Sequence, residues 1–195
     1  DLDSDEAVDE IPMARTFTCH LQTRIDPAHA ELMGTPGDVL EFHLESQAHS
    51  ADLGVNLLNT CTPYANGNVP VKGEHCAWME SSAVVYCNSV LGARTNTEGR
   101  ESTAAAMLTG KIPYWGFHLD ENRLGTHRID VEVEMADVMD WGMLGYFAGD
   151  VVGEEIPVLT GIESPPNLIR HKHFGAAAAS SGGVEMYHVV GATPE

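Results

Sequence analysis

The sequence predicts an α/β fold with a largely parallel sheet and flanking helices. The main observation is that strand-like segments alternate with helix-length segments in the second half of the chain, in the order strand, helix, strand, helix, strand. This alternation is typical of parallel strands joined by right-handed crossovers. The second observation is size, because 195 residues with 43% hydrophobic side chains can bury one sizeable core.

The chain begins with an acidic segment. Six of the first ten residues are Asp or Glu, a composition typical of a solvated segment without fixed structure. We therefore expect residues 1–14 to be a disordered lead-in and residues 15–195 to form a single domain.

The next two elements are a strand and a helix. Loose alternation of β-branched and aromatic residues favours a strand over residues 15–25. An apolar cluster followed by a polar tail predicts a helix over residues 38–53, and Gly54 is suited to end it.

A buried strand, a loop and a core helix follow. Residues 55–61 form a short apolar run that ends before Pro63, so Cys61 is expected where a strand gives way to a loop. Residues 64–73 are rich in Asn, Gly and Pro and predict a loop. Residues 81–91 are then apolar over the length of a helix.

A short helix and another strand come next. Residues 101–108 predict a helix that Gly110 ends. Residues 112–119 predict a strand, which would bring His118 and Asp120 to its end.

The remaining elements supply the alternating pattern. Residues 128–135 alternate apolar and charged side chains with period two, as in a half-buried strand. Residues 139–152 predict a core-packed helix, because four apolar residues recur at helical spacing. These residues are Leu144, Phe147, Ala148 and Val151.

One more helix lies between two strands at the end of the chain. Residues 156–159 and 184–190 predict strands. Ser164, which precedes two prolines, is a candidate N-cap for the helix between them, and Gly182 with Gly183 is suited to end it.

The charge balance is strongly acidic. The chain has 29 Asp and Glu against 10 Lys and Arg, a net charge of −19. This field opposes binding to nucleic acid or to an anionic membrane. We interpret it as a means of staying soluble in a high-salt cytoplasm. No apolar run approaches the length of about 20 residues that spans a bilayer.

The cysteines favour a reducing compartment. There are four, without CxxC spacing, and no signal peptide is recognised in the sequence. We therefore expect a cytoplasmic protein.

The stretch 80–99, ESSAVVYCNSVLGARTNTEG, contains the strongest candidate for ligand binding. Arg94 follows the predicted core helix, and its guanidinium suits a carboxylate or a phosphate. Thr95 and Asn96 can add neutral donors to the same anion. The alternative is that Arg94 is an ordinary solvated charge.

Other polar residues at this helix are candidate substrate contacts. Ser81 and Ser82 lie at its start, where helix capping is the alternative explanation. Asn88 lies in its interior, and a buried amide needs a hydrogen-bond partner.

Three further residues are candidates for proton transfer. Glu74 and His75 are adjacent in a loop led by glycine, and they are equally consistent with a loop that binds its own side chains. His118 belongs to the cluster HLDENR, for which a salt-linked turn with Arg123 is the alternative.

Several motifs together resemble the aconitase X family. They are CTPY at 61–64, GNVP at 67–70, GEHCAWMESSAV at 73–84, YWGFHLDENR at 114–123 and ASSGGVEMYHVVGATPE at 179–195. The resemblance implies an aconitase-superfamily-like fold and a hydro-lyase that removes water from a small hydroxy acid. The substrates known in the family are cis-3-hydroxy-L-proline and mevalonate 5-phosphate.

The resemblance also implies a cofactor and missing parts. Cys61 falls on the family's cysteine in the C-[TA]-P-Y motif, so it is expected to bind iron or an iron–sulfur cluster. Residues 15–195 would be a fragment of a longer catalytic domain. A swivelling domain or small subunit would close the site, and a serine on it would act as the general base.

The chain departs from the family at several positions. The usual TNREG has become TNTEG, with Arg100 following, which puts specificity or activity in doubt unless Arg100 compensates. Cys76 and Cys87 replace an aliphatic and a small residue, and we interpret both as core substitutions.

Two other functions are consistent with the sequence. The first is a non-catalytic subunit or decayed paralogue that binds a partner. The second is a mononuclear metal enzyme built on Cys61, His75 and His118, which predicts bound metal without acid-labile sulfide.

Overall fold

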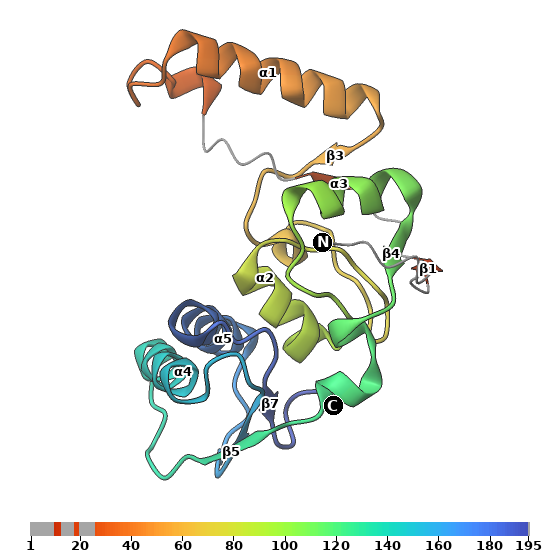
Figure 1. The fold of residues 1–195 in the computed structure, drawn as a ribbon. Coiled ribbons are helices and arrows are strands. Elements are labelled where there is room, and N and C mark those ends of the chain that lie inside the picture. Colours follow the sequence, from red (N-terminus) through yellow and green to blue (C-terminus); the bar gives the residue numbers. More distant parts are fainter. Residues whose placement is uncertain (1–9, 13–17, 20–25, 195) are drawn as a thin grey trace. The chain divides into compact units, whose positions relative to one another are not determined.

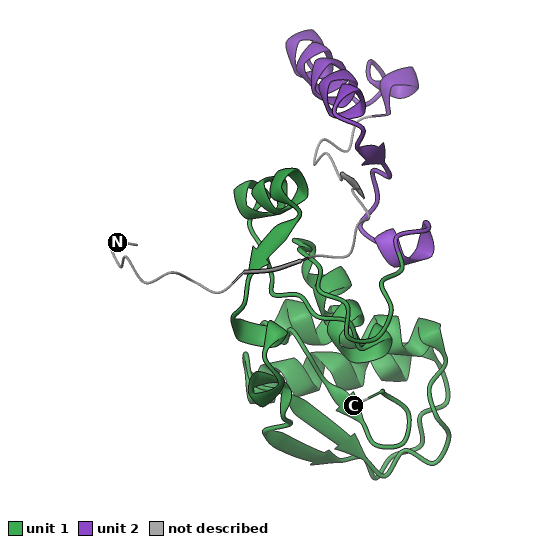
Figure 2. Ribbon diagram, turned by 90° about the vertical axis from the view of Figure 1, so that its right-hand side faces the viewer, with its two compact units in different colours: residues 1–14, 69–195 green, residues 15–68 purple. Residues whose placement is uncertain are grey.

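The computed structural model describes residues 10–12, 18–19 and 26–194. The chain divides into two compact units, one of residues 1–14 and 69–195 (unit 1) and one of residues 15–68 (unit 2) (Figure 2). From the sequence alone we expect one domain over residues 15–195.

Unit 2 is built around one long helix. Helix α1 (Gly37–Asp52) confirms the helix predicted over residues 38–53. Two 3-10 turns, η1 (Pro27–His29) and η2 (Pro63–Ala65), belong to the same unit.

The strands of unit 2 are shorter than predicted. Strand β2 (Thr18–Cys19) pairs in parallel with β3 (Asn56–Leu57). The other positions of the strand predicted over 15–25 lie outside the described residues. The strand predicted over 55–61 ends early because Asn59 has a φ of 45°, which takes the backbone out of the extended region.

In unit 1, helix α2 (Ser81–Tyr86) continues directly into a π-helical segment, η3 (Cys87–Leu91). Together they confirm the helix predicted over residues 81–91. Gly92 ends the segment with a φ of 65°, which a side chain would disfavour. Such π segments are frequent near functional sites.

Helix α3 (Arg100–Thr109) and a small antiparallel pair follow. Gly110 ends α3 as predicted. Strand β4 (Lys111–Pro113) pairs with β1 (Glu10–Pro12), which lies in the predicted acidic lead-in.

The strand predicted over residues 112–119 is wrong beyond position 113. Gly116 has a φ of 58° and starts the 3-10 turn η4 (Gly116–His118), after which η5 (Asp120–Arg123) follows. His118 therefore lies in a turn and not at the end of a strand.

The carboxy-terminal part of unit 1 confirms the predicted α/β architecture. Strands β5 (His127–Asp130), β6 (Pro157–Thr160) and β7 (His188–Val189) form a parallel sheet in the order β5-β6-β7. Helices α4 (Val138–Val152) and α5 (Leu168–Gly182) are the crossovers, and they lie side by side (Figure 1).

Glycines set the contact between α4 and α5. A Cβ at Gly145 would overlap the carbonyl oxygen of Phe174, and one at Gly149 would overlap that of Ala178. The two backbones therefore approach more closely than larger residues would allow.

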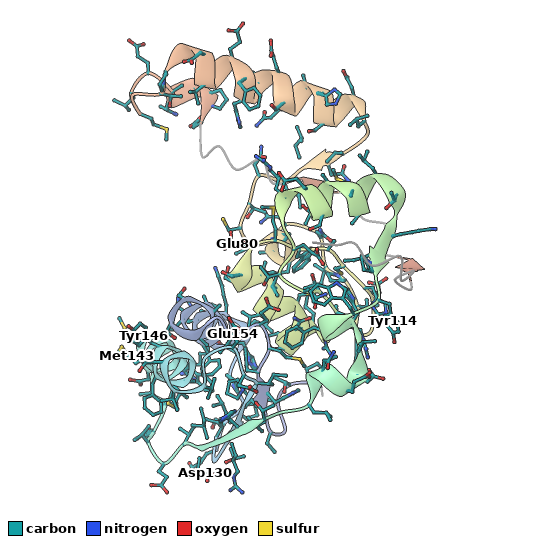
Figure 3. The ribbon with its side chains drawn as sticks, viewed as in Figure 1. Glu80, Tyr114, Asp130, Met143, Tyr146 and Glu154 are labelled. Carbon is teal, nitrogen blue, oxygen red and sulfur yellow. The ribbon has the colours of Figure 1, made fainter. Side chains whose placement is uncertain are left out.

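This contact corrects the apolar stripe predicted for α4. Phe147 and Val151 are 55% and 59% exposed, so they do not face the core. Met143 and Tyr146, also exposed, lie on the side of α4 that is turned away from α5 (Figure 3). The buried face is Trp141, Gly145, Ala148, Gly149 and Val152.

The start of α5 also differs from the prediction. Asn167, and not Ser164, is the N-cap, and its side-chain oxygen accepts a hydrogen bond from the backbone N–H of Arg170 at 3.0 Å. The helix ends at Gly182 as predicted.

The main core of unit 1 joins the parallel sheet to three helices. It contains Val85, Val131, Trp141, Ala148, Val152, Leu159, Phe174, Ala178, Val184, Tyr187 and Val189. Across the described part of the chain, no helix has the length and apolar character needed to cross a membrane.

Candidate active site

Two loops of unit 1 lie side by side and bring the candidate residues together. The backbone N–H of Arg94 donates to the carbonyl of Glu74, and that of Cys76 donates to the carbonyl of Arg94, both at 2.8 Å. These bonds form a parallel bridge between His75 and Arg94. The two motifs that contain them thus form one structural unit.

The centre of the site is a pair of histidines. The Nδ1 atoms of His75 and His118 are 2.9 Å apart, which is hydrogen-bond distance. His118 is completely buried, whereas His75 is partly exposed. The ring of Tyr114 packs edge-on against His75 with ring centroids 6.1 Å apart.

Both imidazoles are held in the neutral form. Burial lowers the pKa of His118 to about 4, with His75, Arg123 and Arg94 adding to the effect. Burial also lowers the pKa of His75, with Arg94 and Arg123 adding to the effect and Asp120 opposing it. At pH 7 each ring therefore carries one N–H, and one of these two protons lies between the Nδ1 atoms.

Arg94 is fixed next to this pair. Its Nη1 donates to the carbonyl oxygen of His118 at 2.8 Å, and its Nη2 forms an ion pair with Asp120. The Arg94 side chain is 17% exposed and that of Asp120 is 84% exposed. The hydrogen bond from Arg94 lowers the pKa of the Asp120 carboxyl. The ion pair that the structure shows in the predicted salt-linked turn joins Asp120 to Arg94.

The side chain of Asn88 makes its hydrogen bonds within the protein. Its amide nitrogen donates to the carbonyls of Thr95 at 2.9 Å and Glu185 at 3.0 Å. Its side-chain oxygen accepts from the N–H of Thr95 at 3.0 Å and from Arg123 at 3.3 Å. The amide makes the four bonds open to it, so it holds the loop that carries Arg94.

Thr95 and Asn96 act on the same loop. The buried Thr95 hydroxyl accepts from the N–H of Trp78 at 3.0 Å and donates to the carbonyl of Asn96 at 2.8 Å. The Asn96 side-chain oxygen accepts from the N–H of Phe117 at 2.7 Å. A Cβ at Gly116 would overlap this side chain, so glycine is needed there.

Glu74 and the two serines are placed differently. The Glu74 carboxylate accepts a hydrogen bond from the N–H of Val71 at 2.7 Å and so binds its own loop. Ser81 is exposed and Ser82 partly exposed at the start of α2, whose N-cap is Glu80. Arg100 pairs with Glu101 at 2.6 Å, and both are exposed.

Arg123 is a residue whose importance the sequence analysis missed. It is 3% exposed, and its guanidinium donates to the carbonyls of Phe117, Asn88 and Ala93 at 3.1–3.2 Å. The carbonyl of Arg123 lies 2.9 Å from Nε2 of His188. Its presence in a motif was the available signal, but nothing in the sequence distinguishes a buried arginine from an exposed one.

The metal ligand predicted from the resemblance belongs to unit 2. Cys61 is a partly exposed cysteine in the loop after β3, whereas Cys76 and Cys87 are buried in unit 1. Burial and a hydrogen bond with Cys76 raise the pKa of Cys87. The Cys87 thiol is therefore not set up as a thiolate ligand.

The described residues do not fit an iron–sulfur cluster by themselves. Within residues 26–194 no three His, Cys, Asp or Glu side chains form a group that could hold a metal ion. Cys61 can supply one thiolate, but a cluster needs several. Cys61 belongs to unit 2, whereas His75 and His118 belong to unit 1, so the mononuclear site on these three residues stays a prediction.

Comparison with known families gives two matches. The family described as "Aconitase X first domain" matches residues 11–121, and "Aconitase X second domain" matches residues 125–195.

Curated proteins and a solved structure are also similar. The large subunit of phosphomevalonate dehydratase from Methanothermobacter thermautotrophicus is 52% identical over 76% of this chain and 37% of that protein. Cis-3-hydroxy-L-proline dehydratase from Hypocrea jecorina is 40% identical over 88% of this chain and 29% of that protein. The crystal structure of Thermococcus kodakaraensis aconitase X (holo-form) has a TM-score of 0.81 and 34% identity over 96% of this chain and 54% of that chain. The chain thus spans well under half the length of these curated relatives.

Proposed function

This chain belongs to the aconitase X family, and we propose on that basis that it forms part of a hydro-lyase that removes water from a small hydroxy acid. The observation that carries the proposal is the cluster of His75, His118 and Arg94, in which neutral imidazoles lie beside a fixed guanidinium. The dehydratase names of the relatives support the same reaction class.

The reaction breaks a C–H bond and a C–O bond and forms a C=C bond, with water as the second product. Arg94 binds the carboxylate or phosphate of the acid, because its planar fork matches either anion. The bound anion displaces the exposed carboxylate of Asp120 from the guanidinium. His75, which forms a backbone bridge with Arg94, contacts the same ligand through its Nε2. The base that takes the carbon-bound proton lies outside this chain.

The substrate is a phosphorylated hydroxy acid, mevalonate 5-phosphate. The support is that phosphomevalonate dehydratase large subunits include the relative with 52% identity, whereas the cis-3-hydroxy-L-proline dehydratases match at 40%. The phosphomevalonate dehydratases are named large subunits, so a small subunit is the expected partner.

Cys61 supplies one thiolate to an iron or iron–sulfur centre whose other ligands come from outside the described residues. The holo-form named for the T. kodakaraensis relative supports a bound cofactor. Iron and acid-labile sulfide per chain test this proposal, measured on the native assembly that contains the chain. Cys61→Ala should lose iron, and Cys76→Ala, which changes a buried thiol, should keep it. Equal iron in both variants would reject Cys61 as a ligand.

The reaction itself is tested with the native assembly. A tagged copy of the chain is expressed in its own organism and purified anaerobically with its partners. Mevalonate 5-phosphate and cis-3-hydroxy-L-proline are offered separately, and dehydration is followed by mass spectrometry. Loss of water from mevalonate 5-phosphate alone is expected. Turnover of cis-3-hydroxy-L-proline instead would identify that compound as the substrate. Turnover of neither compound would favour a non-catalytic subunit.

A further inference from the structure

We propose that His118 holds His75 as the neutral tautomer with its proton on Nε2, so that His75 donates a hydrogen bond to the bound acid. His118 is then a positioning residue, and His75 is a donor rather than a base. The tautomer follows from the geometry of the pair, whereas the identity of the ligand rests on the function proposed above.

The first step is that the pair has two possible arrangements. The Nδ1 atoms are 2.9 Å apart, so one ring donates its Nδ1–H and the other accepts with a bare Nδ1. A neutral imidazole carries one N–H. The donating ring therefore has a bare Nε2, and the accepting ring has a protonated Nε2.

The surroundings of His118 decide between the two arrangements. This ring is completely buried, and its Nε2 has no hydrogen-bond partner among the described residues. If His118 accepted at Nδ1, its Nε2–H would be a buried donor without an acceptor. Among buried backbone groups, an orphaned N–H is rarer than an under-satisfied carbonyl, and we apply the same order to the ring nitrogens of His118. His118 is therefore the donor in the pair, and its Nε2 carries the unused lone pair.

The third step concerns His75. Because its Nδ1 accepts from His118, its proton lies on Nε2. His75 is partly exposed, and its Nε2 has no hydrogen bond to the described part of the chain. This N–H is thus available to a ligand, and Arg94, which forms a backbone bridge with His75, places its positive charge near the same ring.

The arrangement limits the chemistry of the site. Both rings resist a second proton because of burial and the nearby cations Arg94 and Arg123, with Asp120 the opposing charge. The only lone pair of neutral His75 is occupied by His118. His75 therefore stabilises negative charge on the acid or its leaving hydroxyl, and another group must take the proton from carbon.

The test is nitrogen-15 NMR of the 195-residue chain grown with labelled histidine. Two-bond proton–nitrogen correlations distinguish the tautomers, and His75→Asn and His118→Asn assign the signals by their loss. At pH 7 we expect a protonated Nε2 on His75 and a protonated Nδ1 on His118. A protonated Nδ1 with a bare Nε2 on His75 would overturn the proposal.

Two further variants test the positioning role. His118→Asp removes the donor and leaves an acceptor, so the signal of His75 should shift to a protonated Nδ1. His171→Asn removes another buried histidine, whose pKa is also lowered to about 4, and should leave the tautomer of His75 unchanged. If the Asp variant does not fold, the wild-type spectrum still decides. A failed dehydration assay would reject the enzyme reaction without changing this spectrum.

Discussion

The side chain of Arg123 joins three parts of the site. Its guanidinium binds carbonyl oxygens from the π segment, from the loop before Arg94 and from η4. It also contacts the side-chain oxygen of Asn88. The buried Arg123 side chain therefore holds together the loops that carry the histidine pair.

We predict that Arg123→Lys lowers the unfolding free energy by about 3 kcal/mol. The single ammonium group of lysine cannot reach all the carbonyl oxygens that the guanidinium of Arg123 binds. Urea unfolding measures the change. Arg128→Lys is the matched control, since Arg128 is 72% exposed and pairs with the exposed Asp130. A similar, small effect of both substitutions would show that Arg123 does not brace the loops.

The buried histidines predict a loss of stability in acid. In the folded protein the pKa of His118 and of His171 is lowered from 6.5 to about 4. Between pH 6.5 and pH 4 these histidines are therefore protonated in the unfolded chain but neutral in the folded one. Stability should therefore fall as pH falls through this window. At about 1.4 kcal/mol per pKa unit, each histidine contributes up to about 3 kcal/mol.

Unfolding free energies between pH 7.5 and pH 4.5 test this dependence. His171→Asn should reduce the slope, because it removes one of the two groups. A slope that stays the same in this variant, or a wild type that is more stable in acid, would contradict the lowered pKa values.

At the scale of single residues, the sequence predicted where the chemistry lies better than what each side chain does. Arg94 and His75 were found through their motifs, and the structure brings them together. Asn88, Thr95 and Asn96 were expected to contact substrate, but their polar atoms bond within the protein. The bonds depend on chain segments up to 97 residues apart, which local patterns do not reveal.

At the scale of elements, the contact between α4 and α5 depends on glycine. We predict that Gly145→Ala destabilises the protein by about 1–3 kcal/mol, because the new methyl group would overlap the backbone of Phe174. Thermal or urea unfolding measures the effect.

Gly142 provides the control in the same helix. A Cβ there meets nothing within 4 Å, so Gly142→Ala should stabilise by up to about 1 kcal/mol through helix propensity alone. Destabilisation by both substitutions would mean that helix distortion, rather than contact with α5, explains the first result.

Helices were predicted more accurately than strands. The ends of α1, α3 and α5 followed from glycines and were confirmed. The face of α4 was predicted in part: Ala148 is buried and Leu144 packs against the core, but Phe147 and Val151 are exposed. Hydrophobicity marks large apolar residues, whereas this contact uses small ones. The strand expected over residues 112–119 failed because its apolar pattern says nothing about the positive φ of Gly116.

At the scale of the whole molecule, the net charge of −19 predicts a dependence on salt. Repulsion among the acidic groups weakens the folded state, and ions screen it. The urea midpoint should therefore rise when KCl is raised from about 0.01 M to about 1 M, over which the screening length falls from about 30 Å to about 3 Å. An unchanged or lower midpoint would contradict the interpretation of the charge.

The α/β class and the parallel sheet were predictable because alternation of strand and helix patterns restricts the topology. The division into two units was not, since unit 1 combines residues 1–14 with residues 69–195, which are distant in the sequence. The family resemblance placed the motifs, and two family domains match the chain on either side of residues 122–124.

The most direct test of the proposed hydro-lyase site is kcat/KM for mevalonate 5-phosphate, measured on the native assembly with either Arg94→Gln or Arg100→Gln. Loss of a charge-assisted anion contact of about 1.5–3 kcal/mol should lower kcat/KM by about 10- to 150-fold in the first variant. Arg100 is exposed and pairs with Glu101, so the second variant should stay within about twofold of the wild type. Equal activity of the two variants would contradict the assignment of Arg94 and its neighbours as the substrate site.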